Sequence, residues 1–219
     1  MQIQTTGRIL YVDPKQQFKA MGYALYKSVD QGASWSKVLV VPTSSANRAL
    51  SGLSLYRRLM RKGIYKLMPA GDKFVLFCDK ELFLFDELNQ LKSIGALSGS
   101  RPLYPCVQNQ KLYYGEYKGN PDRKSIRILC FDLKTNSWSV AAELDGIRHI
   151  HGIFKDPYAD RLWITTGDLD HECKIMYTGD EFKSLSTFLE GSQNYRAIYL
   201  HFDQDTITYG TDAPDTPNH

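Results

Sequence analysis

Short apolar or aromatic runs alternate along the chain with Asp, Asn, Gly and Pro, which predicts short strands separated by tight turns. Helical periodicity is nearly absent. The clearest runs cover residues 10–12, 73–77, 82–85, 111–114, 161–165 and 206–209. We therefore predict an all-β fold.

The strand pattern repeats. Successive segments begin at Arg101, Arg148 and Arg196, which are 47 and 48 residues apart, and each ends at a glycine with an acidic residue next to it or two positions on. A strand-only unit of about 40–50 residues is typical of a four-stranded β-propeller blade. The sequence therefore predicts a β-propeller with about five blades present.

Two arrangements fit the ends of the chain. We expect the first repeat to lack its innermost strand, and the last repeat, from Tyr195 onward, to have inner strands only. Either the two ends complete one shared blade and close a five-bladed ring, or the chain is a fragment of a six- or seven-bladed propeller. In both cases we expect a single propeller domain over residues 1–219, which is incomplete at its C-terminus in the second case. An unclosed ring leaves sheet edges exposed to unwanted pairing.

One motif carries structural chemistry. Residues 28–35 read Ser-Val-Asp-Gln-Gly-Ala-Ser-Trp and fit S-x-D-x-G-x-x-W, the Asp-box. We expect the Asp30 carboxylate to accept backbone N–H groups and fix the turn, and Gly32 to supply a positive φ. Trp35 is expected to pack between sheets. Weaker copies cover residues 132–138 and 178–182.

Over nearly its whole length the chain resembles uncharacterised bacterial Asp-box (BNR-repeat) proteins of the sialidase-like β-propeller family. The resemblance rests on the Asp-box and on residues 115–117, 148–152, 156–158, 163–168, 191–196 and 211–214. Chains of that family continue past the position matching Asn218, which favours the fragment hypothesis. The resemblance implies a fold and brings no established reaction with it.

Propeller ligands usually lie at a mouth of the central channel, where the innermost strands begin. We expect Arg101, Arg148 and Arg196 to open inner strands at equivalent positions, so that their guanidiniums converge on a carboxylate or phosphate. The resemblance adds that sialidases hold the sugar carboxylate with such an arginine cluster. Tyr195 and Asp212 join the predicted substrate-binding set. The alternative is that these arginines bridge blades or carry charge into solvent.

A histidine pair follows the second arginine. His149 and His151 are two positions apart on a predicted strand and therefore share a face. They are candidates for acid–base catalysis, or for holding a metal ion together with Asp168, Asp170 or Glu172 from the following loop, which also contains His171. The alternative is a hydrogen-bonded pair that packs between blades. The prediction uses the pair in catalysis and includes no metal ion or other cofactor.

Glu116, Asp168 and Asp212 form a set of acidic residues close to glycines at equivalent points of the repeat. Two carboxylates facing each other across a channel are able to act as acid and base on a glycosidic bond. A turn-capping role is the favoured alternative for each carboxylate. We predict Glu116 and Asp168 as catalytic residues beside His149 and His151.

Sialidase activity itself is not supported. The arginine-bearing Phe/Tyr-Arg-Ile-Pro motif that such enzymes carry is replaced by a faint echo at residues 7–10. Tyr117 and Tyr195, with Glu116, are candidates for a tyrosine nucleophile by position only.

Charge and segment composition limit the partners. The net charge of +3 does not indicate a polyanion partner, and a basic stretch between Arg57 and Lys66 is expected to be a solvated edge, so no nucleic acid is predicted. The longest apolar run, residues 74–78, is too short to span a membrane. Residues 1–6 show no secretory signal and the four cysteines are widely spaced, so we expect free thiols and a cytoplasmic location.

The sequence therefore predicts a propeller that binds or hydrolyses an acidic carbohydrate, or another anionic small molecule, at its channel mouth. If the chain is an enzyme, it is expected to be similar to glycoside hydrolases. The alternative is a non-catalytic scaffold that presents a rigid surface to a protein partner.

Overall fold

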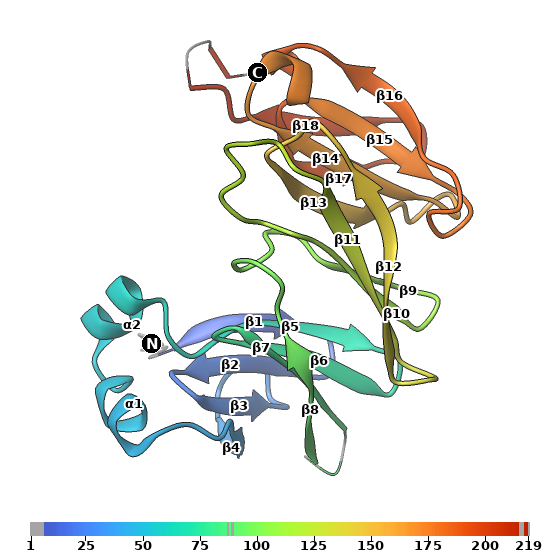
Figure 1. Cartoon of the computed structure of the whole chain (residues 1–219). Helices are drawn as coiled ribbons and strands as arrows, with labels where there is room; N and C mark the ends of the chain where they lie inside the picture. Colours follow the sequence, from blue (N-terminus) through green and yellow to red (C-terminus); the bar gives the residue numbers. More distant parts are fainter. Residues whose placement is uncertain (1–6, 87, 89, 215–216, 219) are drawn as a thin grey trace. The chain divides into compact units, whose positions relative to one another are not determined.

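The structure is a computed structural model that describes residues 7–86, 88, 90–214 and 217–218, apart from the side chains of Ser54 and Arg58. Its described strands form five antiparallel sheets (Figure 1). The chain divides after Leu97 into two compact units. The proposed single domain over residues 1–219 stays a prediction, and residues 1–6, on which the signal-peptide analysis rests, lie outside the described residues.

The N-terminal unit contains two four-stranded sheets. The first is formed by β1 (Arg8–Val12), β2 (Gln17–Met21), β3 (Ala24–Ser28) and β4 (Ser36–Val40), and the second by β5 (Ile64–Ala70), β6 (Lys73–Cys78), β7 (Glu81–Phe85) and β8 (Leu91–Ala96). Strand β5 lies against β1 and β2. Leu25 and Leu76 are fully buried in the apolar cluster that these sheets share.

The C-terminal unit contains two four-stranded sheets and one two-stranded sheet. These are β9 (Cys106–Gln108), β10 (Lys111–Gly115), β11 (Ile126–Asp132) and β12 (Ser137–Leu144); β13 (His149–Lys155), β14 (Leu162–Gly167), β15 (Lys174–Thr178) and β16 (Ser186–Glu190); and β17 (Ala197–Phe202) with β18 (Ile207–Thr211). Strand β13 lies against β9 and β10, and β17 lies against β13 and β14. In each unit, then, the first strands of successive sheets pack together.

Strand predictions were confirmed for all six runs, which lie in β1, β6, β7, β10, β14 and β18. The expectation that the first repeat lacks its innermost strand was wrong, because β1 to β4 form a four-stranded sheet. Strand β2 was missed because Lys19 interrupts its apolar pattern. The Lys19 side chain is nevertheless buried, with its ammonium 4.2 Å from the centre of the Trp35 ring.

Two short helices between β4 and β5 were also not predicted. They are α1 (Ser45–Leu50) and α2 (Ser54–Met60), and the Ser44 side chain caps α1 by accepting the Asn47 N–H. Their apolar side chains, including Leu55 and Leu59, are exposed, so no buried stripe marks them in the sequence. Among the residues that the structure describes, no helix has the length and apolar character needed to span a membrane.

Two hairpin turns share one set of side-chain hydrogen bonds. The Asp30 carboxylate accepts the Ser34 N–H at 2.9 Å and the Ser34 hydroxyl at 2.5 Å. Asp180 accepts the equivalent groups of Ser184 at 2.9 and 2.6 Å. In the second turn Phe182 occupies the place of Gly32 with a φ of 72°. Its ring is buried in the core, which offsets the strained backbone.

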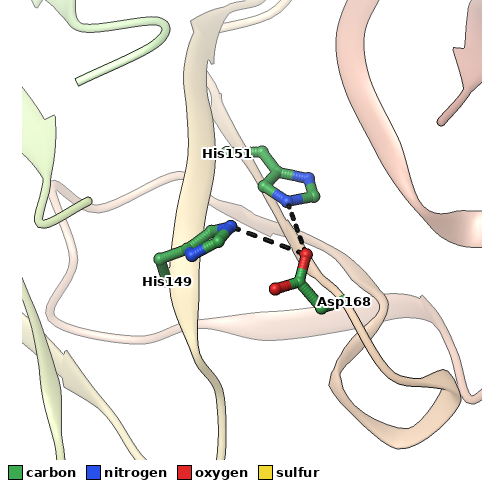
Figure 2. A group of neighbouring side chains, drawn as sticks. All are labelled: His149, His151 and Asp168. Atoms are coloured by element: carbon green, nitrogen blue, oxygen red, sulfur yellow. Dashed lines mark ion pairs between the residues drawn. The ribbon is translucent and has the colours of Figure 1, made fainter. Parts of the chain in front are cut away.

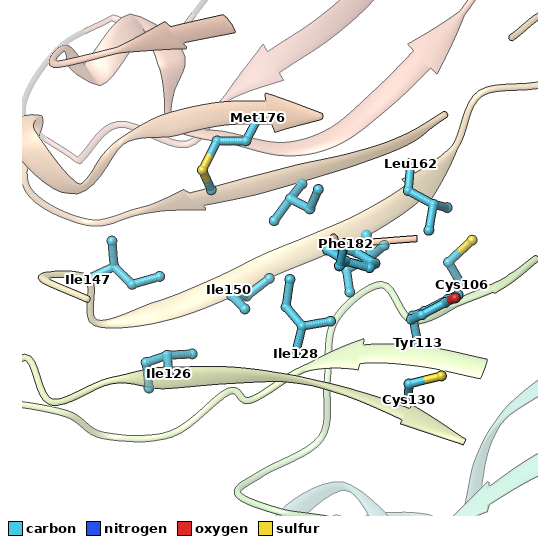
Figure 3. Close-up of a cluster of buried hydrophobic side chains, with 12 residues drawn as sticks. Cys106, Tyr113, Ile126, Ile128, Cys130, Ile147, Ile150, Leu162, Met176 and Phe182 are labelled. Atoms are coloured by element: carbon cyan, nitrogen blue, oxygen red, sulfur yellow. The ribbon is translucent and has the colours of Figure 1, made fainter. Parts of the chain in front are cut away.

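The core of the C-terminal unit lies between its two four-stranded sheets (Figure 3). Ile128 from β11 and Ile164 from β14 are fully buried there, and Ile150 from β13 is 2% exposed. Gly115, at the end of β10, has no side chain where the sheets approach closely. A Cβ atom at Gly115 would lie 2.4 Å from the Cβ of Ile150, so only glycine fits.

We therefore predict that Gly115→Ala forces β10 and β13 apart and lowers the free energy of unfolding by about 1–3 kcal/mol. Gly119→Ala is the matched control, because no atom lies within 4 Å of a Cβ placed there. Denaturant unfolding of both variants checks this prediction. Equal stability of the two variants would contradict the sheet packing described here.

Candidate functional site

The C-terminal unit contains a pocket of about 740 Å³ that several charged side chains line. Five segments supply its walls: the start of β13, the loop after β14, the turn before β17, and one residue each after β10 and β18. The lining residues are Tyr117, Arg148, His149, Asp168, Leu169, Asp170, Gln193, Arg196 and Pro214.

The register of β13 with β14 builds the floor of this pocket. His149 pairs with Gly167, so Asp168 follows directly beside the histidine. The ladder is irregular between Ile150 and Gly152, and His151 lies at this bulge. A Cβ atom at Gly167 would lie 2.9 Å from Cε1 of His151 and 3.1 Å from Cγ of Arg196. The missing side chain therefore lets three elements approach one point.

Asp168 is the centre of the polar contacts. Its Oδ1 accepts a hydrogen bond from Nη2 of Arg196 at 2.9 Å, and its Oδ2 accepts one from Nη1 of Arg148 at 3.1 Å. The Gln193 amide donates to the Asp168 carbonyl at 2.9 Å. Burial by itself would raise the pKa of Asp168, but interactions with His151, His149 and Arg196 outweigh it and lower that pKa to about 2. Asp168 is therefore ionised at neutral pH.

Both histidines turn toward the same carboxylate oxygen (Figure 2). Nε2 of His149 lies 3.7 Å from Oδ1 of Asp168, and Nε2 of His151 lies 3.9 Å from it. Burial lowers the pKa of His149 to about 4 despite the nearby carboxylate, so its imidazole is neutral at pH 7. The Tyr117 ring lies 4.2 Å from the His149 ring, centre to centre.

The structure brings together five of the nine predicted site residues: Arg148, His149, Asp168 and Arg196 line the pocket, and His151 lies beside Asp168. The shared face predicted for the histidine pair is confirmed (Figure 2). Three lining residues, Leu169, Gln193 and Pro214, were not predicted. Leu169 and Pro214 lie in loops and Gln193 begins a single 3-10 turn, Gln193–Tyr195, and alternating hydrophobicity gives no signal for such segments.

The other predicted residues lie elsewhere in the unit. Arg148 and Arg196 directly precede β13 and β17, whereas Arg101 precedes β9 by five residues and does not line the pocket. Two prolines, Pro102 and Pro105, lie in the intervening segment, and each lacks the N–H that a continued strand would use.

Tyr195 and Asp212 flank the pocket without lining it. Tyr195 packs against an apolar cluster that includes Trp163 and Leu200. Asp212 is exposed, and its backbone N–H donates to the Arg196 carbonyl at 3.1 Å. Asp212 thus contacts the backbone of a pocket residue but leaves its own carboxylate outside.

Glu116 is enclosed in a separate ion-pair network. Its carboxylate is fully buried and pairs with Arg127 at 2.6 Å and with Lys118 at 2.9 Å, while the Ser98 hydroxyl donates to it at 2.5 Å. Burial by itself would raise the pKa of Glu116, but these hydrogen bonds outweigh it and lower the pKa to about 2. The structure places Glu116 away from the pocket wall, in a role that holds β10 to β11.

Comparisons with known proteins identify fold alone. No protein-family model and no curated protein matches the chain. Solved structures do match, at low identity. One is a nidogen/laminin complex, with a TM-score of 0.59 and 7% identity over 94% of this chain and 71% of that chain. A GH74 xyloglucanase from Xanthomonas campestris gives a TM-score of 0.58 and 16% identity over 83% of this chain and 29% of that chain.

A third match is PorZ, described as an essential bacterial surface component of the type-IX secretion system of Porphyromonas gingivalis. It gives a TM-score of 0.59 and 12% identity over 94% of this chain and 25% of that chain. The xyloglucanase and PorZ are β-propeller proteins. The chain spans less than a third of either protein, and at these identities the likeness supports a propeller-like arrangement of four-stranded antiparallel sheets.

The Glu116 network makes stability depend on pH. The folded pKa of about 2 lies below the ordinary value of 4.5, so the ionised carboxylate stabilises the fold above about pH 4.5, and this contribution is lost as the pH falls toward 2. We predict that Glu116→Gln is less stable than the unaltered protein at pH 7 and loses less stability between pH 4.5 and 2.

Urea unfolding across this pH range measures the effect. Glu190→Gln, which alters an exposed carboxylate on β16, is the control and should follow the unaltered protein. Parallel curves for Glu116→Gln and the unaltered protein would contradict the assignment of the network.

Proposed function

We propose that the C-terminal unit binds a small anionic ligand, an acidic carbohydrate, in the pocket around Asp168. The observation that carries this proposal is the pair of guanidiniums, from Arg148 and Arg196, held side by side on one carboxylate. The Arg148 side chain is 48% exposed and uses Nη1 on Asp168, which leaves further N–H groups for a ligand carboxylate.

Other pocket groups suit the hydroxyls and the ring of a sugar. Oε1 of Gln193 and Nε of Arg196 are buried and have no hydrogen-bond partner among the described residues. Such buried polar groups are costly unless a bound molecule or water satisfies them. Asp170 offers a carboxylate to hydroxyl donors, and Tyr117 offers an aromatic surface. These groups support a ligand with both acceptors and donors.

Binding is better supported than hydrolysis. Glycoside hydrolysis uses two carboxyl groups that face the scissile bond. Of the two carboxylates predicted as catalytic, Asp168 is held by two arginines and Glu116 is enclosed by Arg127 and Lys118. His149, neutral at pH 7, remains the candidate proton acceptor of the pocket.

We also infer that the chain is an Asp-box propeller of the sialidase-like kind. The shared hydrogen bonds of the turns at Asp30 and Asp180 support this, as does the packing of successive sheets through their first strands. The likeness to structures with TM-scores of 0.58 and 0.59 agrees with it. The proposal includes the blade number: about five blades are present, either as a closed ring or as a fragment of a six- or seven-bladed propeller.

We predict that glucuronate binds more tightly than glucose, which lacks the carboxylate. We also predict that Arg148→Ala weakens glucuronate binding roughly 10- to 100-fold. This range corresponds to the loss of charged hydrogen bonds worth about 1.5–3 kcal/mol. Arg148→Lys keeps the charge without the planar fork and is expected to give an intermediate affinity. Isothermal titration calorimetry measures the binding of glucuronate and glucose to the unaltered protein, and of glucuronate to the two Arg148 variants.

Arg161→Ala is the matched control, because Arg161 is exposed, lies in the same unit and packs over the Tyr177 ring away from the pocket. It should bind glucuronate as the unaltered protein does. Equal affinities for glucose and glucuronate, or equal binding by the Arg148 and Arg161 variants, would contradict the proposal and favour the non-catalytic scaffold hypothesis.

A further inference from the structure

We propose that His149, His151 and Asp168 form a three-ligand site for a divalent transition-metal ion, with Zn²⁺ as the best match. The site goes beyond the anion-binding proposal, because a metal ion is able to bind there whether or not a carbohydrate does. Three ligand atoms converge there, hydrogen bonds orient two of the side chains, and the ligand types suit one ion.

The ligand atoms are close enough for one ion. One atom each from His149, His151 and Asp168 lies within 4.8 Å of the other two. The two Nε2 atoms lie 3.7 and 3.9 Å from Oδ1 of Asp168. Ligands about 2.1 Å from a tetrahedral zinc ion are about 3.4 Å apart. Binding therefore requires both nitrogen–oxygen distances to shorten by a few tenths of an ångström, and the two histidine nitrogens, which lie within 4.8 Å, to reach a similar separation.

A backbone hydrogen bond fixes the orientation of His151. Its Nδ1 lies 3.1 Å from the carbonyl oxygen of Ala197. A carbonyl oxygen only accepts, so Nδ1 carries the proton, and the lone pair of a neutral imidazole is on Nε2, the atom that faces Asp168. Histidines that bind metals usually donate their other ring N–H in this way.

Asp168 is held by hydrogen bonds from outside the ligand set, in the manner of a metal-binding carboxylate. Arg196 donates to Oδ1 and Arg148 to Oδ2, while Gln193 donates to the backbone carbonyl. An oxygen that accepts one hydrogen bond retains a second lone pair for an ion. Such outer contacts fix the direction of the ligand atom. The cost is that two positive charges lie close to the bound ion.

The centre of the arrangement has room for a cation. Nε2 of His151 accepts in the neutral tautomer that the Ala197 carbonyl selects, the carboxylate oxygens of Asp168 accept, and Nε2 of His149 accepts in one of its two neutral tautomers. Both distances from Oδ1 to the histidines exceed the length of a hydrogen bond. A positive centre between these atoms would satisfy all of them, and a metal ion contacts three at once whereas a proton contacts two.

The ligand types select the metal. Two imidazoles and one carboxylate suit zinc and similar first-row ions, whereas Mg²⁺ and Ca²⁺ prefer sites made only of oxygen. Three protein ligands leave at least one coordination position for water or for a group of a bound molecule. Because His149 and Asp168 line the pocket, that position is reached from the pocket.

Titration of the metal-stripped protein with Zn²⁺, without carbohydrate, tests the proposal. We expect one equivalent to bind, with affinity weakened more than about 100-fold in His149→Ala and in His151→Ala, because outer contacts alone contribute 10- to 100-fold. Asp168→Asn keeps the shape of the side chain and should also weaken binding. Co²⁺ should give a visible absorption band in the unaltered protein that both histidine variants lose.

His201→Ala is the control, because His201 is exposed on β17 and pairs only loosely with Asp203 at 3.7 Å. It should bind Zn²⁺ as the unaltered protein does, and circular dichroism confirms that each variant is folded. Absence of zinc binding by the unaltered protein, or equal binding by the His149, His151 and His201 variants, would overturn the proposal. Because these titrations contain no carbohydrate, either result would overturn the metal site without bearing on the glucuronate measurements that test the anion-binding proposal.

Discussion

The close approach of three elements at Gly167 is the constraint on which the candidate site depends. His151 from β13 and Arg196 from the start of β17 both occupy space that any larger residue at position 167 would take. The same position ends β14 and pairs with His149, so the next residue, Asp168, enters between the histidines and the arginines. Without that approach, Asp168 and Arg196 would not meet the two histidines of β13.

One carboxylate, that of Asp168, contacts both the guanidiniums proposed to bind an anion and the imidazoles proposed to bind a cation. Asp168 pairs with Arg148 through Oδ2 and with Arg196 through Oδ1, and the same Oδ1 faces the two imidazoles. The remaining guanidinium N–H groups are donors for an anion, whereas the second lone pair of Oδ1 and the imidazole nitrogens are acceptors for a cation. Both proposed ligands follow from this division, and each is tested without the other.

Sequence repetition predicted much of the site because equivalent places in successive sheets gather together. Arg148 and Arg196 directly precede β13 and β17, and the residues that follow were found through that spacing. The repeat spacing wrongly placed Arg101 in the pocket, because Pro102 and Pro105 delay the start of β9. It also wrongly placed Glu116 there, because the Glu116 carboxylate pairs with Arg127 on β11. The apolar runs likewise predicted the strands that they cover, but not β2, whose run is interrupted by Lys19. The Lys19 side chain packs against Trp35. Local prolines decided the case of Arg101, whereas contacts with residues on other strands or turns decided those of Glu116 and Lys19.

Gly167→Ala tests the central claim most directly. The closest contacts of the added methyl group are all side-chain atoms: Cε1 of His151 at 2.9 Å, Cγ of Arg196 at 3.1 Å and Sγ of Cys173 at 3.5 Å. We expect the fold to be retained while the affinities for zinc and glucuronate both fall by at least about tenfold, a loss of about 1.4 kcal/mol each. Gly179→Ala, whose nearest neighbour lies 3.8 Å from the added Cβ, should leave both affinities unchanged. Full retention of both affinities in Gly167→Ala would contradict the account.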